Sequence, residues 1–381
     1  MSGRHRQVII AVELLIEVRT TTTEVTNIQD GNDSEIDHRY VFICGMPRSG
    51  TSMLGRNIGR LVDCTDLKNT GTIEDEGQNV QDVYPTAHEL GGPGRFGFDT
   101  RAHRTESSTL LRPENVSKLK TSWSRYWDNT KRICVEKTPG NLLATRFLQA
   151  AFDNCSFIVI RRHPVPVAMA CQKWKFNVTS LDNLFRHWLH CHRLFEGDRK
   201  YLKRVYELTY EDYLEDQDTY HQEIAAFIGT RVPEPPEDDT YRYVIQWRNP
   251  TGLRVPEKTM EKASPIHNQK YIDQWRKLLT ESPFRFYYRH LVRKYEPEFN
   301  QYGYSLISGL PNGDEILREG GVIANALGVL SSVAADTGAL MWRSALRCMV
   351  ALRRAAKAIL PQLVIGKLRQ LRITEAWLKT Y

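Results

Sequence analysis

Residues 40–52, YVFICGMPRSGTS, set the fold of this chain. Their first five residues form a short apolar run, which is typical of a strand buried on both faces of a parallel sheet. Gly45 and Pro47 end that run, and an amphipathic stretch follows from Thr51 to about Val62. The order therefore predicts a strand, a tight turn and a helix.

The same order recurs further along the chain. Short apolar runs at residues 132–135 and 156–160 each precede a Pro-marked turn, and a weaker strand is predicted at 204–208. Alternating strands and helices predict an α/β fold with a doubly wound parallel sheet of P-loop type. The carboxyl ends of such strands meet at one edge of the sheet, so the turns that follow them should share one ligand site. Those turns are residues 45–52, 136–139 and 161–164.

The turn after the first strand has the composition of an anion-binding loop. Gly45 and Gly50 allow a tight backbone turn, and the N–H groups that open the following helix can donate to phosphate oxygens. A Walker A loop has Lys directly after its second glycine, but Thr51 stands there, which argues against an ordinary nucleoside triphosphatase. A turn that binds no ligand is the alternative. The residues expected to bind the anion are Pro47, Arg48, Ser49, Gly50, Thr51 and Ser52.

The string PRSGTS between a strand and a helix resembles the 5′-phosphosulfate loop of sulfotransferases that use 3′-phosphoadenosine 5′-phosphosulfate (PAPS). Its Arg48 is similar to the form found in tyrosylprotein sulfotransferases and many bacterial members. Residues 157–170, FIVIRRHPVPVAMA, resemble the 3′-phosphate segment of the same family. The resemblance implies that Arg162 binds the 3′-phosphate, with Arg161 as the alternative. Ala170 stands where the family usually has a serine that also contacts this phosphate.

The resemblance extends to two more strand ends. Residues 205–214, VYELTYEDYL, are similar to a strand-end segment of the family, which implies that Tyr210 approaches the adenine. Residues 132–139, RICVEKTP, resemble a segment of heparan sulfate sulfotransferases in which the lysine reaches the sulfate. This implies that Lys137 stabilises the leaving group. Three roles are open for Glu136: a base, an orienting partner or a strand-end ion pair.

The catalytic base is expected among acidic residues downstream of the loop. In relatives with an Arg-type loop, an acid in this region deprotonates the acceptor, and here the region holds three consecutive acids at 74–76. We take Glu76 as the first choice, because Gly77 after it would let a ligand approach closely. A solvated acidic loop is the alternative for each acid, and His88 and Glu136 are further candidates.

No metal is expected in the site. Sulfuryl transfer, like phosphoryl transfer, can be driven by cationic and N–H groups that stabilise charge on the transferred and departing oxygens. The cluster of His187, His190 and His192 does not place all three rings on one helix face, so these histidines are predicted to be structural or solvent-facing.

Three segments are predicted along the chain. Residues 1–38 are an N-terminal lead-in, and 39–306 form the sulfotransferase-like α/β domain, the extent of the resemblance. Within that domain, residues 64–130 lack strand periodicity and are rich in Gly, Pro and charge, so they are predicted to be an insertion over the site. Residues 307–381 are predicted to be a helical, basic extension.

The positive charge of the chain lies in its C-terminal part. Residues 341–381 have nine Lys or Arg and one Glu, a net charge of +8, whereas the whole chain carries +7, which leaves −1 for the rest. The main body therefore gives no sign of binding nucleic acid. Residues 344–371 have the pattern of a basic amphipathic helix, which predicts peripheral contact with an anionic membrane. Packing on the body, or on a second subunit in a homodimer, is an equal alternative.

Two apolar stretches are candidate membrane segments. The N-terminal run is interrupted by Glu13 and Glu17, and residues 321–342 contain Asn325 and Asp336, so neither is predicted to span a membrane. The seven scattered cysteines favour a reducing compartment. These features predict a cytoplasmic protein, peripheral at a membrane where the basic helix binds one.

The sequence thus predicts a sulfotransferase that moves a sulfuryl group from PAPS, as co-substrate, to a hydroxyl or amine. A carbohydrate, a lipid and a hydroxylated small molecule are the acceptor classes that stay open. A P-loop kinase of a nucleotide or metabolite is one alternative. An inactive nucleotide-binding module attached by its basic tail is the other.

Overall fold

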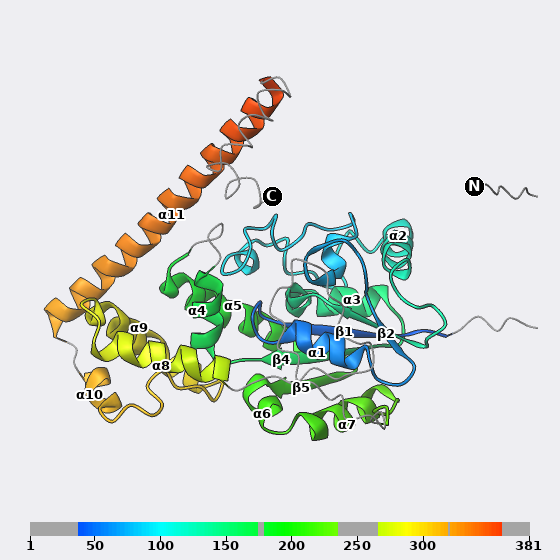
Figure 1. Cartoon of the computed structure of the whole chain (residues 1–381), viewed down its shortest axis with the longest axis horizontal. Coiled ribbons are helices and arrows are strands. Elements are labelled where there is room, and N and C mark those ends of the chain that lie inside the picture. The colour runs from blue at the N-terminus through cyan, green and yellow to red at the C-terminus, as the bar shows by residue number, and fades with distance from the viewer. Residues whose placement is uncertain (1–36, 174–178, 235–265, 319–320, 360–381) are drawn as a thin grey trace, which may run out of the picture. The chain divides into compact units, whose positions relative to one another are not determined.

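The computed structural model describes residues 37–173, 179–234, 266–318 and 321–359. Within them lies one five-stranded parallel sheet with the strand order β2-β3-β1-β4-β5 (Figure 1). Its strands are β1 (Arg39–Gly45), β2 (Cys64–Asp66), β3 (Ile133–Lys137), β4 (Cys155–Arg161) and β5 (Val205–Thr209). The predicted doubly wound α/β fold is confirmed.

Each central strand is buried on both faces, and successive residues point to opposite sides. Phe42 and Cys44 of β1 belong to one core cluster, and Val41 and Ile43 belong to a second. The second cluster includes apolar residues of α1 (Thr51–Ile58), α6 (Tyr210–Glu215) and α7 (Gln217–Ile228). Figure 1 shows α6 and α7 on one side of the strands and α3 on the other.

The first cluster fills the opposite face of the sheet. Its helices are α2 (Pro113–Ser124), α3 (Thr145–Ala151), α4 (Pro164–Gln172), α5 (Leu181–Arg199), α8 (Ile266–Thr280), α9 (Arg285–Asn300) and α10 (Gly313–Arg318). Short 3-10 turns lie at Ile73–Asp75, Gly77–Asn79, Phe96–Phe98 and Pro139–Leu143. The last helix, α11 (Val322–Ile359), contacts α9 and α5.

The strand order places the first loop at the point where the sheet changes direction. β1 pairs with β3 on one side and with β4 on the other. The chain therefore winds one way from β1 to β3 and β2, and the other way to β4 and β5. Ligands of such sheets bind at this switch point, beyond the carboxyl ends of the strands. The loop after β1 and the residues after β4 meet there.

Three elements differ from the sequence prediction. β2 begins at Cys64, inside the stretch predicted to lack strands, because three residues are too short to give a periodic pattern. α1 ends at Ile58 rather than near Val62, since Gly59 and the turn after it interrupt the helix. The C-terminal extension is helical, as predicted, but its helix α11 begins at Val322, before the basic amphipathic stretch predicted at 344–371. Residues 1–36 and 360–381, which hold most of the lead-in and the end of the predicted basic helix, lie outside the described residues.

Candidate active site

The loop after β1 turns through two residues with positive φ. Arg48 has φ 74° and Gly50 has φ 96°, and the Ser49 N–H donates to the Met46 carbonyl at 3.0 Å. α1 then begins at Thr51 with no side-chain cap on Gly50, so the first N–H groups of the helix are left to a ligand or to solvent. Ser49 Oγ is buried and has no hydrogen-bond partner among the described residues. The loop thus has the open backbone and the unpaired hydroxyl that an anion site needs.

Arg162, just after β4, reaches this loop. Its Nη1 donates to the Arg48 carbonyl at 2.7 Å, and its Nε donates to Asn268 Oδ1 on α8 at 3.2 Å. The guanidinium carbon lies 4.1 Å from the centre of the Tyr210 ring. Burial lowers the pKa of Arg162, which is 7% exposed. A buried cation with these contacts is placed for an anionic ligand at the loop.

Arg161, the alternative at this strand end, has a different environment. It forms ion pairs with Glu196 at 2.8 Å and with Glu207 at 3.6 Å. Its guanidinium also lies over the ring of Tyr302. Of the two arginines, Arg162 is therefore the one that contacts the loop after β1.

Tyr210 packs directly against the loop. A Cβ on Gly50 would lie 2.6 Å from Tyr210 Cδ2, so no other residue fits there without displacing the ring. The same ring faces the Arg162 guanidinium. The loop after β1, the end of β4 and the start of α6 therefore form one packed unit.

A second group of polar residues, which the sequence did not point to, holds this unit together. Glu211 Oε1 accepts from the His163 N–H and from Asn268 Nδ2, both at 3.2 Å, and its Oε2 accepts from Tyr304 OH at 3.3 Å. Burial raises the pKa of Glu211. The residue joins the start of α4 to α8, and Thr209 caps α6 through the Asp212 N–H. Nothing in the local sequence marks Asn268 as a partner of Arg162.

Ala170 is buried in α4, at the position where the resemblance predicts a serine. Lys173, the last residue of the described segment 37–173, donates to Tyr271 OH on α8 at 2.9 Å. The neutral polar side chain that contacts Arg162 directly is the amide of Asn268 on α8.

Lys137, at the end of β3, contacts the loop that holds the three acids. Its Nζ donates to the Glu74 carbonyl at 2.9 Å and to Glu76 Oε1 at 3.2 Å. The Lys137 and Glu76 side chains are 8% and 15% exposed, so water screens the pair weakly. A Cβ on Gly55 of α1 would lie 2.8 Å from Lys137 Cβ, which shows how closely the lysine stem packs on the helix that follows the loop.

The structure separates the three consecutive acids. Glu74 pairs with Arg56 at the surface, at 3.8 Å, and Asp75 Oδ1 accepts from the Thr70 N–H at 2.9 Å. Only the Glu76 carboxylate reaches Lys137 among these three. Glu74 and Asp75 have φ values of 60° and 47°, a left-handed turn that points neighbouring side chains in different directions. His88, a further candidate for the base, is exposed in the turn at residues 87–90.

Glu136, at the end of β3, is bonded to the loop that follows the three acids at 74–76. It is fully buried, and its Oε1 accepts from the Gly77 N–H at 2.9 Å and from Thr138 Oγ1 at 2.6 Å. Its Oε2 accepts from Asn141. Burial raises the pKa of Glu136 to about 7, although its three donors oppose this rise. A Cβ on Gly77 would lie 2.6 Å from Glu136 Oε1, so Gly77 makes room for this carboxylate and not, as we predicted, for a ligand.

The three clustered histidines are structural. His187 Nε2 accepts from the Gly97 N–H at 3.0 Å, and His190 Nε2 lies 3.0 Å from the Gly97 carbonyl. His192 Nδ1 lies 2.8 Å from the Trp188 carbonyl, and burial lowers the pKa of His187 and His192 to about 3. No group of three or more His, Cys, Asp or Glu suited to a metal ion occurs among the described residues.

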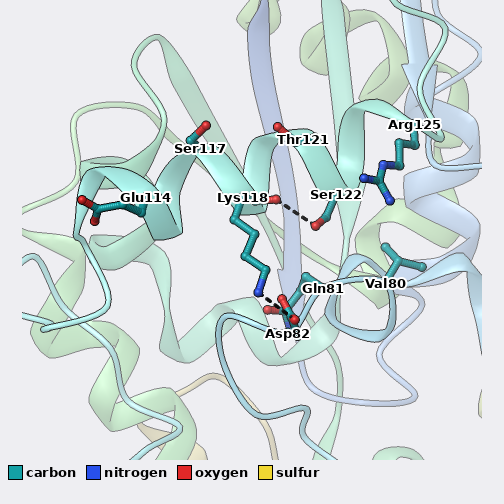
Figure 2. A pocket seen from close by; sticks show the side chains of 9 residues that line it. All are labelled: Val80, Gln81, Asp82, Glu114, Ser117, Lys118, Thr121, Ser122 and Arg125. Atoms are coloured by element: carbon teal, nitrogen blue, oxygen red, sulfur yellow. Dashed lines mark hydrogen bonds and ion pairs between the residues drawn. The ribbon is translucent and has the colours of Figure 1, made fainter.

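A surface recess of about 590 Å³ lies elsewhere, between the exposed side of α2 and residues 80–82 (Figure 2). Lys118 points across it to Asp82, with Nζ and Oδ2 2.8 Å apart. Both side chains are more than half exposed. The recess contains none of the predicted site residues, and its lining has no buried charge, so we do not assign it a ligand.

Comparisons with known proteins show the family of this chain. Residues 40–234, just over half of the chain, match a family model described as the sulfotransferase family. No curated protein matches the chain. Among solved structures, it is similar to the sulfotransferase domain of the Synechococcus PCC 7002 olefin synthase, at 18% identity and a TM-score of 0.33 over 53% of this chain and 77% of that one.

Two further solved structures have similar values. The sulfotransferase domain from the curacin biosynthetic pathway has 15% identity and a TM-score of 0.37, over 70% of this chain and 98% of its own. The sulfotransferase from Alicyclobacillus acidocaldarius has 17% identity and a TM-score of 0.35, over 62% and 91%. Because these scores are below 0.5, the family assignment depends on the family-model match.

Proposed function

This chain belongs to the sulfotransferase family, and we propose that it transfers a sulfuryl group from PAPS to a hydroxyl or amine of its acceptor. The observation that supports this most is the contact between Arg162 and the loop after β1, 2.7 Å from Nη1 to the Arg48 carbonyl. It brings the residue proposed for the 3′-phosphate against the loop proposed for the 5′-phosphosulfate. A donor with phosphate groups at the 3′ and 5′ positions of one ribose fits such a pair of sites.

Each part of the donor has residues that suit its chemistry. The backbone and hydroxyls of residues 47–52 would bind the 5′-phosphosulfate, whose negative charge suits a helix N-terminus. Arg162 and the Asn268 amide beside it would bind the 3′-phosphate. The Tyr210 ring, which faces the Arg162 guanidinium and packs against Gly50, is the residue proposed to approach the adenine.

The transfer step uses the Lys137–Glu76 pair. The acceptor oxygen forms a bond to sulfur while the bond from sulfur to the bridging phosphate oxygen breaks, and the electron pair stays on that oxygen. The Lys137 ammonium stabilises the charge that develops there, and the Glu76 carboxylate takes the acceptor proton. Glu136 positions the loop that holds Glu76, through the Gly77 N–H, and takes no part in the proton transfer.

The acceptor is proposed only by class: a carbohydrate, a lipid or a hydroxylated small molecule. Arrangements shared by a fold do not identify a substrate. The residues next to the Glu76–Lys137 pair come from the segment between α1 and β3, so this segment is where acceptor specificity is expected.

Calorimetry tests the donor. We expect 3′,5′-adenosine bisphosphate to bind without magnesium and more tightly than AMP, which lacks the 3′-phosphate. Preference for ATP with magnesium would instead identify a P-loop kinase and overturn the proposal. Transfer of labelled sulfate from PAPS to a panel of sugars, lipids and phenols then tests the reaction. Tight bisphosphate binding with no transfer to any class would identify an inactive nucleotide-binding module.

A further inference from the structure

The helix α11 exposes its large apolar side chains to solvent, whereas a helix of a globular protein usually buries them against the core. Among the described residues, ten of the fourteen exposed large apolar side chains lie on α11. They are Ile323, Leu327, Val329, Leu330, Val333, Leu340, Met341, Trp342, Met349 and Leu352. Monomeric soluble proteins rarely expose a continuous apolar surface of this kind, so it needs a partner.

The side of α11 that faces the body is built from small and polar residues. Ser332 and Ala339 are buried, and a Cβ on Gly328 would lie 2.4 Å from His290 Cγ of α9. Asp336 accepts a hydrogen bond from Ser180 Oγ at the start of α5. The large apolar side chains therefore project outward because the inner side of the helix is already packed on α9 and α5.

The charged residues of α11 are mostly basic. Its only acid is Asp336, which is bonded to Ser180, whereas five basic residues follow Trp342. They are Arg343, Arg347, Arg353, Arg354 and Lys357. A complementary surface must therefore be apolar along the exposed side of the helix and anionic beside the basic residues of its second half.

An anionic lipid bilayer has both properties. A second copy of this chain is the less complementary partner by overall charge, since residues 1–340 carry a net charge of only −1 whereas an anionic bilayer is negative across its whole surface. Gly328, Ser332 and Ala339, three small residues suited to close helix–helix packing, are already packed against the body. Trp342 stands where the apolar part meets the basic part, as tryptophans do at membrane interfaces.

We propose that α11 binds the surface of an anionic membrane, lying in the interface with its exposed apolar side chains against the acyl chains and the basic residues within 343–357 among the headgroups. By length and composition alone, Ile323–Leu352 could also cross a membrane, with a mean hydropathy of 1.3. Spanning would pull Asp336 away from Ser180 and Gly328 away from His290, which the in-plane arrangement keeps in place.

Vesicle flotation of the full chain tests this proposal. We expect binding to vesicles of phosphatidylcholine with 30% phosphatidylserine, weaker binding to phosphatidylcholine alone, and release by high salt. The combined variant Leu327→Gln, Leu330→Gln and Met341→Gln should bind these vesicles at least about tenfold more weakly than the wild type. Phe284→Gln is the matched control, because Phe284 is 63% exposed but lies outside α11, and it should bind like the wild type.

Three results would overturn the proposal. They are no vesicle binding by the wild type, unchanged binding by the triple variant, and protein that stays on the vesicles after an alkaline high-salt wash, which would indicate a spanning helix. Sedimentation equilibrium adds a check: a dimer that the triple variant abolishes, without vesicle binding, would identify a second copy as the partner. Calorimetry with 3′,5′-adenosine bisphosphate reports separately on the fold and the donor site of each variant.

Discussion

Arg162 is held from three directions, each by a different part of the chain. The Arg48 carbonyl and the Asn268 amide accept from two of its nitrogens, and the Tyr210 ring covers its flat face. A planar guanidinium can make these contacts and still face a ligand, whereas an ammonium group is a point charge. The residue proposed for the 3′-phosphate is thus also one that contacts the loop proposed for the 5′-phosphosulfate.

Arg162→Lys should separate these two tasks. We expect affinity for 3′,5′-adenosine bisphosphate to fall by about tenfold or more, since a hydrogen bond to a charged group contributes roughly 1.5–3 kcal/mol. Affinity for AMP should fall less, because AMP has no 3′-phosphate. Arg161→Lys is the matched control, because Arg161 pairs with Glu196 and Glu207, and both affinities should stay near those of the wild type. An equal loss for the two nucleotides in Arg162→Lys would contradict a role at the 3′-phosphate.

Glu76→Gln tests the proposed base. The amide keeps the size of the side chain but cannot take a proton, so we expect kcat for sulfate transfer to fall by about 10²–10⁴. The affinity for 3′,5′-adenosine bisphosphate, measured by calorimetry, should change little. Glu74→Gln is the control: Glu74 forms an exposed ion pair with Arg56, and such pairs contribute little. Full activity of Glu76→Gln would return the role of base to another residue.

At the level of elements, the loop after β1 and α6 depend on each other through Gly50. This glycine has φ 96°, and a Cβ there would meet the Tyr210 ring at 2.6 Å. Any side chain would therefore combine backbone strain with displacement of the ring from the loop and from Arg162. The contact between two elements, and not the turn alone, requires glycine.

Gly50→Ala and Gly303→Ala form a matched pair. Gly303 has φ 80° with nothing within 4 Å of its Cβ position, so alanine there adds strain alone, about 1–2 kcal/mol in the free energy of unfolding. We expect Gly50→Ala to lose more stability in urea unfolding and to weaken 3′,5′-adenosine bisphosphate binding strongly, while Gly303→Ala binds normally. Normal binding by Gly50→Ala would show that the Tyr210 contact is not needed for the donor.

At the scale of the whole molecule, Glu136 should link stability to pH. Its pKa is about 7 in the folded chain, above the ordinary value of 4.5, because burial disfavours the charged form. The folded state then holds this proton more tightly than the unfolded state. The stabilisation is complete below about pH 4.5 and is lost as the pH rises to about 7.

Glu136→Gln should remove this dependence. We expect the free energy of unfolding of the wild type, relative to Glu136→Gln, to decrease by roughly 3 kcal/mol between pH 4 and pH 8. Urea unfolding of both proteins across that range is the measurement. A difference that stays constant would mean that Glu136 is ionised throughout, held by its three donors.

The sequence predicted the sheet well, because β1, β3 and β4 are apolar runs that end in Gly, Pro or charge. It could not predict β2, whose pairing with β3 is what makes three residues a strand. Nor could it separate Glu76 from its two acidic neighbours, since the left-handed turn between them leaves no pattern in side-chain type. Asn268 was beyond prediction because only the folded chain brings α8 to Arg162. The roles of all these residues stay predictions.

The bond between Arg162 and Asn268 also has a consequence in time. The two residues are 106 positions apart. A ribosome that adds about 5–20 residues per second needs roughly 5–20 s to travel from one to the other. During that interval β1 and β4 can already exist, but the arginine between them lacks one of its partners. The proposed donor site is therefore completed late in synthesis, because the contact between Arg162 and Asn268 cannot form before α8 has been made.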